Sequence, residues 1–417
     1  MMELSTEISA VKEKALLRNT SFLILMMTGL MSSISLSMFL FSESWYVIQE
    51  LHFAAGLGFI LIASSVPRIL LMLIGGVIAD RFRKTTIIFF CMVTESILVI
   101  SILILLVFNI QSIWIFVIAA LLFGISDSLQ IPARTSLLPT LITKEQTMRA
   151  NSIYSLINQI SMVAGAFIAG LVLHNLGYYW SFSLIASGMI LSSILVTQIK
   201  SADVPLQAEA QGEKESFFST LKEGFLYMKH SSFLKALLFF AVFLNFFVVG
   251  PITIGIPIIA DTLFDGNALA FSYIEGSFVG GAIIGSILIG ILNMNKGRGK
   301  FILIMIMMNA FFYLCFSLAN QLVSLVLFSL LMGVTISLIN TPINAIVQTK
   351  TDPAMLGRVM SFIIMAALGL TPLSYGLTSL FISSGINVQT IMLCSSIPLL
   401  IAGPFVYFKV PALRNEQ

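Results

Sequence analysis

The sequence predicts an all-α membrane protein of twelve transmembrane helices. Of the 417 residues, 58% are hydrophobic and only 10% are charged, and the mean hydropathy is +1.01. Soluble domains are nearer half apolar and about a quarter charged. Because so few charges could not cover a surface in water, lipid must be the solvent for most of the outside of this chain.

Twelve apolar segments predict the helices, since crossing a bilayer takes roughly 20 mainly apolar residues. The first six segments are residues 20–42, 54–79, 86–108, 112–134, 150–173 and 178–198. The second six are residues 234–259, 267–292, 301–318, 322–345, 359–382 and 387–408.

The basic residues predict that both termini are cytoplasmic. Suppose that twelve helices alternate in direction and that the N-terminus is inside. Every Lys and Arg except Arg68 then falls in or beside the loops and tails on one side of the membrane. An excess of Lys and Arg marks the cytoplasmic side of a membrane protein. The same distribution supports the number of helices, because losing one helix would scramble it.

An internal repeat predicts two six-helix halves. The stretch 131–152 resembles the stretch 341–361, and Pro132 matches Pro342 at a spacing of 210 residues. Two bundles related by an axis along the membrane normal are the expected architecture for such a repeat. The chain is therefore predicted to have three parts, an N-terminal six-helix bundle at 1–199, a cytoplasmic linker at 200–232 and a C-terminal six-helix bundle at 233–417.

The linker is predicted to contain a short amphipathic helix. Phe217, Leu221, Phe225 and Met228 recur at helical spacing after a polar stretch. A helix with one apolar face can lie on the inner face of the membrane. A helix that binds a partner protein is the alternative.

Two short motifs carry a family resemblance. The first follows the second apolar segment and consists of Gly76, Asp80, Arg81, Arg83 and Lys84. The second extends over the tenth and eleventh segments and consists of Asn340, Pro342, Gln348, Gly357, Arg358 and Pro372. In these motifs the sequence resembles the major facilitator superfamily, and in particular the drug:proton antiporter branch that contains macrolide-efflux and enterobactin-export proteins.

The resemblance implies a secondary active transporter that works by alternating access. It implies a small-molecule substrate, proton-coupled efflux of amphiphilic compounds of the drug, macrolide or siderophore class, and a place in a bacterial inner membrane. It also implies that the first motif is a gating loop that holds one face closed, although these charges can also serve only to set the topology. A uniporter or importer of a metabolite, or a lipid flippase of the same fold, is the alternative function.

Two opposite charges are predicted to lie at the same depth within the membrane. An ionisable group at mid-bilayer costs roughly 2.5 kcal/mol or more, so it faces protein or water and usually functions. Arg68 and Glu95 each lie ~20 Å from the turn near Phe82, at a helical rise of ~1.5 Å per residue. We therefore expect an Arg68–Glu95 ion pair, with either a structural or a substrate-binding role.

Two further carboxylates are candidates for proton coupling or for lining a cavity. Asp127 lies in the fourth segment, ~10 Å from its inner end. A carboxylate that is removed from water is more readily protonated near neutral pH, as a proton-coupled carrier requires. A pair with Arg68 or a hydrogen bond across helices is the alternative for Asp127. Glu275 in the eighth segment is a second coupling acid or a residue of the outer vestibule.

The glycines that follow Glu275 predict close helix packing. Gly276 with Gly280, and Gly281 with Gly285, have the small-x-x-x-small spacing that lets two backbones approach.

The sequence gives no sign of an enzyme. It has no metal-binding H-E-x-x-H, no nucleophile G-x-S-x-G and no phosphate-binding G-x-x-x-x-G-K-[ST] motif. We therefore expect no cofactor and no metal. The expected partners are a small-molecule substrate, a proton or another cation, and membrane lipids. Without a basic run, nucleic acid is not a partner, and we expect a monomer.

Overall fold

The computed structural model is helical throughout its regular elements. It describes residues 18–143, 146–199, 232–292, 297–352 and 355–409, together with Leu16, Leu226 and Lys229. Within these ranges there are α-helices, one 3-10 turn and one π-helical segment, and no strand. The predicted linker helix lies outside the described residues except for Leu226 and Lys229.

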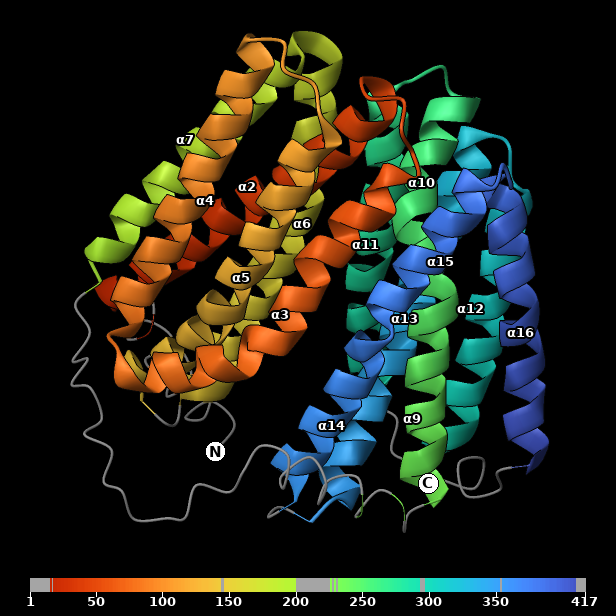
Figure 1. The fold of residues 1–417 in the computed structure, drawn as a ribbon. Coiled ribbons are helices and arrows are strands. Elements are labelled where there is room, and N and C mark those ends of the chain that lie inside the picture. The colour runs from red at the N-terminus through yellow and green to blue at the C-terminus, as the bar shows by residue number, and fades with distance from the viewer. Residues whose placement is uncertain are drawn as a thin grey trace. The chain divides into compact units, whose positions relative to one another are not determined.

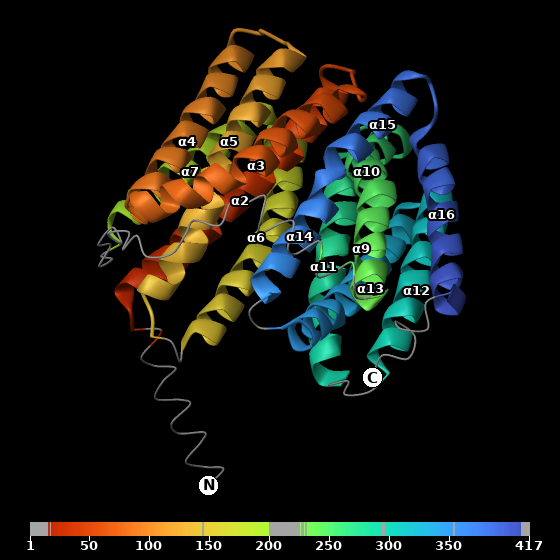
Figure 2. The same cartoon turned by 60° about the horizontal axis from the view of Figure 1, so that its bottom comes forward.

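The chain divides into two compact units (Figures 1 and 2). The first comprises Met1–Glu43 and Val66–Gln211, and the second comprises Ser44–Ser65 and Gly212–Gln417. The helices that lie in or enter the first unit are α2 (Thr20–Gln49), α3 (Gly56–Arg81), α4 (Lys84–Val107), α5 (Ile113–Leu137), the 3-10 turn Leu138–Thr140, α6 (Thr147–Leu176) and α7 (Tyr178–Thr197). The helices of the second unit are α9 (Ser232–Leu244), the π-helix η3 (Asn245–Val249), α10 (Gly250–Leu263), α11 (Ala268–Leu292), α12 (Arg298–Leu318), α13 (Leu322–Lys350), α14 (Leu356–Gly369), α15 (Thr371–Ser383) and α16 (Val388–Lys409).

These helices account for the predicted apolar segments. Within the described residues, 11 helices are long and apolar enough to cross a membrane, and α3 contributes a shorter apolar stretch, Gly56–Met72. In hydrocarbon an α-helix satisfies its own backbone hydrogen bonds, which is why long apolar segments adopt this form.

Short polar signals set several helix ends. The Asn19 side chain accepts a hydrogen bond from Phe22 N at 3.1 Å and caps the start of α2. Ser112 caps α5 by accepting from Trp114 N at 3.4 Å. Gly177 has a φ of 82° between α6 and α7, a conformation that glycine adopts without strain. These caps explain why the loops can be so short.

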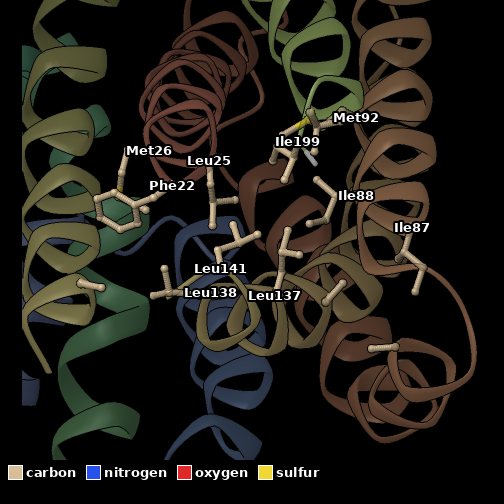
Figure 3. Close-up of a cluster of buried hydrophobic side chains, with 14 of the residues drawn as sticks. Phe22, Leu25, Met26, Ile87, Ile88, Met92, Leu137, Leu138, Leu141 and Ile199 are labelled. Atoms are coloured by element: carbon tan, nitrogen blue, oxygen red, sulfur yellow. The ribbon is translucent and has the colours of Figure 1, made fainter. Parts of the chain in front are cut away.

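The core of the first unit gathers at the ends of α2, α4 and α5 (Figure 3). Phe22, Leu25 and Met26 from α2 meet Ile88 and Met92 from α4. Leu137, Leu138 and Leu141 close the cluster from the end of α5 and the turn after it. Each of these side chains is nearly or fully buried, so protein packing fixes this end of the unit.

Residues Ser44–Ser65, which join α2 to α3, cluster with the second unit. The Trp45 ring stacks on Phe271 of α11 with centroids 5.6 Å apart. The Ser379 hydroxyl of α15 donates a hydrogen bond to the carbonyl of Ala55. These contacts explain why α2 extends to Gln49, seven residues beyond the predicted end.

In the second unit, α11 and α13 pack most closely, and glycine is the reason. A Cβ at Gly281 would overlap the Leu330 carbonyl, and one at Gly285 would lie 3.0 Å from Val334 Cα and Ser337 Cβ. An added Cβ at Gly276 or Gly280 would meet nothing within 4 Å. Close packing is therefore confirmed for the Gly281–Gly285 pair, whereas for Gly276–Gly280 the prediction is wrong.

The segments predicted at 234–259 and 359–382 are each interrupted. The first is divided into α9, η3 and α10, and Pro251 is the second residue of α10, directly after Gly250. The second breaks at Leu370, just before Pro372 at the start of α15. Because proline has no N–H, it cannot complete the helical ladder at these points. In contrast, Pro342 lies inside a continuous α13.

The glycine contact gives a direct test of the α11–α13 interface. Gly281→Ala should lower the melting temperature of the purified protein by several degrees, because the new methyl group overlaps a backbone carbonyl. Gly280→Ala, whose methyl group enters open space, should leave it unchanged or raise it slightly. Equal melting temperatures for the two variants would show that this close approach does not hold the unit together.

Candidate functional site

A group of charged and polar side chains lies inside the first unit, on the apolar helices α3, α4 and α5. Arg68 of α3 and Asp127 of α5 form an ion pair, with 3.8 Å between Arg68 Nη1 and Asp127 Oδ2. The two side chains remain 38% and 22% exposed. At that separation the pair is held by charge rather than by a direct hydrogen bond, so its two members are free to take other partners.

Glu95 of α4 is held by different groups. Its Oε1 accepts hydrogen bonds from the Ser126 hydroxyl at 2.6 Å and from Gln130 Nε2 at 3.2 Å. Glu95 is only 6% exposed. The predicted Arg68–Glu95 pair is therefore wrong, and Arg68 pairs with Asp127 instead.

Helix geometry explains this exchange of partners. Ser126 and Gln130 are four residues apart and share one face of α5, whereas Asp127 is turned by about 100° from Ser126. The face that meets α4 thus brings two neutral donors to Glu95, and the next face directs Asp127 to α3. Depth along the helix could be counted in the sequence, but the rotation of each helix could not.

A close approach of α3 to α5 supports the ion pair. A Cβ at Gly75 would overlap the carbonyl of Ser128. Gly75 lies two turns after Arg68, and Ser128 is adjacent to Asp127. Because the backbones touch there, the long Arg68 side chain can reach the carboxylate.

A second arginine lies near these carboxylates. Arg134 Nη2 donates to the Ser32 hydroxyl of α2 at 3.0 Å. Arg134 also lies within electrostatic reach of both Asp127 and Glu95. The predicted fourth segment ended at Arg134, whereas α5 continues to Leu137. The group therefore holds two carboxyl groups and two guanidinium groups.

Polar contacts continue from this group along α2 and α6. Ser33 Oγ donates to Asn158 Oδ1 at 2.9 Å, and Ser37 Oγ donates to the Met162 carbonyl at 2.8 Å. Asn158 of α6 thus bonds to a neighbouring helix. The arrangement can bind a charged group, hold a proton on a carboxylate and exchange partners within the membrane.

Two other buried carboxyl groups lie apart from the Arg68–Asp127 pair. Glu275 of α11 has a buried Oε2 with no hydrogen-bond partner among the described residues. Glu43 of α2 is 3% exposed, and its Oε1 likewise has no such partner. Glu43 was missed in the sequence because the first segment was predicted to end at residue 42. Its position between Ser42 and Ser44 in an apolar run was the available signal.

The gating loop motif is only partly described. Gly76 faces open space, and the Asp80 side chain lies outside the described part of the structure. Arg81 and Arg83 are exposed, whereas Lys84 at the start of α4 is buried. The gating role of these residues stays a prediction.

The residues of the second-half motif mark the tenth and eleventh segments. Asn340 and Gln348 are exposed on α13, and Pro342 is buried inside the same helix. Gly357 and Arg358 lie in the first turns of α14, and their side chains are outside the described residues. Pro372 begins α15.

Comparison with known families decides the class of protein. The Major Facilitator Superfamily model matches residues 25–366 and, in a second match, residues 238–417. The chain belongs to the Major Facilitator Superfamily. It is accordingly a multi-pass transporter of the cell membrane and not an enzyme.

Curated relatives are bacterial transporters, at modest identity. Macrolide efflux protein A of Streptococcus pyogenes is 25% identical over 334 residues, which is 78% of this chain and 78% of that protein. Enterobactin exporter EntS of Escherichia coli O1:K1 is 25% identical over 69% of this chain and 67% of its own length. The staphyloferrin A transporter of Staphylococcus aureus is 35% identical, over 31% of this chain.

Solved structures confirm the fold. The nucleoside transporter NupG superposes with a TM-score of 0.75 at 13% identity, covering 94% of this chain and 99% of its own. A bacterial homologue of the lysosomal transporter Spinster gives a TM-score of 0.70 at 14% identity, covering 95% of this chain and 98% of its own. At these identities the likeness concerns the fold alone.

The pairing of charges can be tested by rescue. Arg68→Gln should lower the melting temperature by a few degrees, because it leaves Asp127 without its counter-charge. Adding Asp127→Asn should recover much of the loss, since no unpaired charge then remains. Adding Glu95→Gln instead should recover none of it. Rescue by Glu95→Gln rather than by Asp127→Asn would show that Arg68 pairs with Glu95.

Proposed function

We propose that this transporter exports amphiphilic small molecules of the drug, macrolide or siderophore class in exchange for protons. The observation that carries the proposal is the partly exposed Arg68–Asp127 pair, which joins the apolar helix α3 to the candidate span α5. Relatives that are named as a macrolide efflux protein and an enterobactin exporter support the direction of transport.

In the proposed mechanism Asp127 carries the coupling proton. While Asp127 is ionised it neutralises Arg68, and the pair needs no further ligand. When Asp127 takes a proton, its charge is lost and Arg68 is left to attract an anionic or electron-rich group of the substrate. Loss of the proton restores the pair and displaces the substrate from Arg68. Proton and substrate therefore compete for one arrangement of charges, which is the requirement for antiport.

Glu95 and Arg134 set the conditions for this exchange. Glu95, bonded to Ser126 and Gln130, places a second carboxyl group within electrostatic reach of Asp127. Arg134, anchored on Ser32, places a second guanidinium group there. Glu275 is the second candidate acid of the cycle. We assign the substrate-exchanging role to Asp127 because its side chain is accessible and its partner is a guanidinium.

The proposed topology has twelve spans with both termini in the cytoplasm. The 11 spanning helices become twelve if the apolar part of α3 continues to Arg81. Arg81, Arg83 and Lys84 then lie on the same side as the termini, as the positive-inside rule requires. In this proposal the loop motif acts as a gate on the cytoplasmic side. The segment 200–232 is a cytoplasmic linker between the bundles 1–199 and 233–417.

Proteoliposomes with an imposed pH gradient test the coupling. When a macrolide such as erythromycin is added, the wild-type protein should change the lumenal pH. The protons should cross the membrane in the direction opposite to the labelled drug. Asp127→Asn should abolish the coupled proton flux, because the amide cannot take up a proton. Asp265→Asn, the same change at an exposed loop position, should leave the flux unchanged.

Two outcomes would contradict the proposal. Proton flux that persists in Asp127→Asn would move coupling to Glu275, Glu95 or Glu43. Drug movement without any proton flux in the wild type would replace antiport by uniport or by transfer of lipid-like molecules.

A further inference from the structure

Two helices of the second unit break at the same level. The first is α9, η3 and α10, and the second is α14 and α15. The first segments α9 and α14 pack against each other, and α10 packs against α15, which also contacts η3. Figure 1 shows this arrangement, with α9 beside α14 and α10 beside α15. The two breaks therefore separate one pair of half-helices from another pair.

The side chain of Ser374 in α15 joins the two breaks. Its hydroxyl donates a hydrogen bond to the Phe246 carbonyl at 2.5 Å and accepts one from Gly250 N at 3.0 Å. Phe246 and Gly250 are four residues apart, so in a regular α-helix they would bond directly to each other. The Ser374 hydroxyl stands in place of that bond, which is a recognised cause of a local bend.

The surrounding sequence keeps this insertion in place. A Cβ at Gly250 would overlap the Ser374 hydroxyl and lie 2.6 Å from its carbonyl oxygen. Pro251 has no N–H, so the next bond of the ladder, to Phe247, is missing as well. Ser374 is 2% exposed. At the i→i+5 spacing of the π-helix the Phe246 carbonyl faces Pro251, which has no N–H, so without the Ser374 hydroxyl this carbonyl would lack a partner in a medium that offers none.

The second break has a matching construction. Leu370 and Pro372 belong to the Gly-Leu-Thr-Pro stretch at 369–372. Pro372, the second residue of α15, has no N–H to donate to the Leu368 carbonyl. Ser374 N donates to the Leu370 carbonyl at 3.0 Å, so the residue that joins the breaks sits one turn after its own break. An added Cβ at Gly369 would meet nothing within 4 Å.

We propose that Ser374 is a positioning residue of the transport cycle, whose hydroxyl bridges Phe246 and Gly250 and makes α9 and α14 tilt as one pair against α10 and α15. The step is an exchange of hydrogen bonds. In the bridged form the hydroxyl satisfies both backbone groups. In the straightened form Gly250 N bonds directly to Phe246 O, and the released hydroxyl bonds a carbonyl of its own helix, as serine does in many helices.

The two forms differ by the rearrangement of a few hydrogen bonds and leave no backbone group unsatisfied. Two such arrangements of one packed element make a bistable hinge. The inference rests on the membership of a transporter family and is independent of proton coupling and substrate.

Distance measurements by pulsed electron paramagnetic resonance test the hinge without any substrate. Spin labels are placed at Lys235→Cys on α9 and Lys300→Cys on the unbroken α12, both exposed, in reconstituted protein lacking Cys91, Cys315 and Cys394. Ser374→Ala should shift the main distance by several ångströms, because the Phe246 carbonyl can then be satisfied only by the direct bond from Gly250 N. Ser383→Ala, whose hydroxyl bonds Leu380 of its own helix, should leave the distances as in the wild type.

A second variant keeps the test decisive. Gly250→Ala should produce the same shift as Ser374→Ala, because its methyl group occupies the position of the bridging hydroxyl. Gly369→Ala should produce none. If Ser374→Ala does not fold, Gly250→Ala with its control answers the same question. Unchanged distances in a folded Ser374→Ala or Gly250→Ala variant would overturn the proposal.

Discussion

The backbone of this chain must satisfy its own hydrogen bonds, because the hydrocarbon around it offers none. That constraint makes the described regular structure entirely helical and keeps the helix ends at capped, polar positions such as Asn19 and Ser112. It also fixes what can happen where a helix is interrupted. At the break before Pro251 a side-chain hydroxyl from a neighbouring helix takes the place of the missing backbone bond.

The same medium gives meaning to the few charges inside the spans. An isolated charge at this depth is costly, so Arg68 is matched by Asp127, and Glu95 is surrounded by neutral donors from α5. The pair at 3.8 Å is close enough to compensate both charges and loose enough to be exchanged. A transporter needs this combination, since an ion pair sealed by strong direct hydrogen bonds would resist opening.

Much of the fold could be predicted from the sequence, because membrane helices are specified by length and apolarity. The start and end of α4, α7 and α11 agree with the predicted segments to within two residues. The breaks in the seventh and eleventh segments could not be placed, although Pro251 and Pro372 pointed to them. A π-helix depends on which side chain of another helix can enter the ladder, and that is decided by packing.

The residues of the candidate site were predicted, but the observed Arg68–Asp127 pair was only the alternative to the expected Arg68–Glu95 pair. Arg68, Glu95 and Asp127 were found because charged residues in apolar runs are conspicuous. Glu43 was missed because the first segment was predicted to end one residue before it. The choice of Asp127 over Glu95 as the partner of Arg68 depends on the rotation of α5, which hydropathy does not report. Helix rotation also decides that Gly281 and Gly285 face α13 whereas Gly276 and Gly280 do not, and the shared spacing of the two pairs does not report it.

Infrared difference spectroscopy on the reconstituted protein tests most directly the claim that Asp127 is the exchangeable proton carrier. The account predicts a protonated carboxyl band that grows as the pH is lowered and is missing from Asp127→Asn. It also predicts that the band remains in Asp265→Asn. A titrating carboxyl spectrum that is identical in the wild type and in Asp127→Asn would contradict the account, because the coupling proton would then reside on another group.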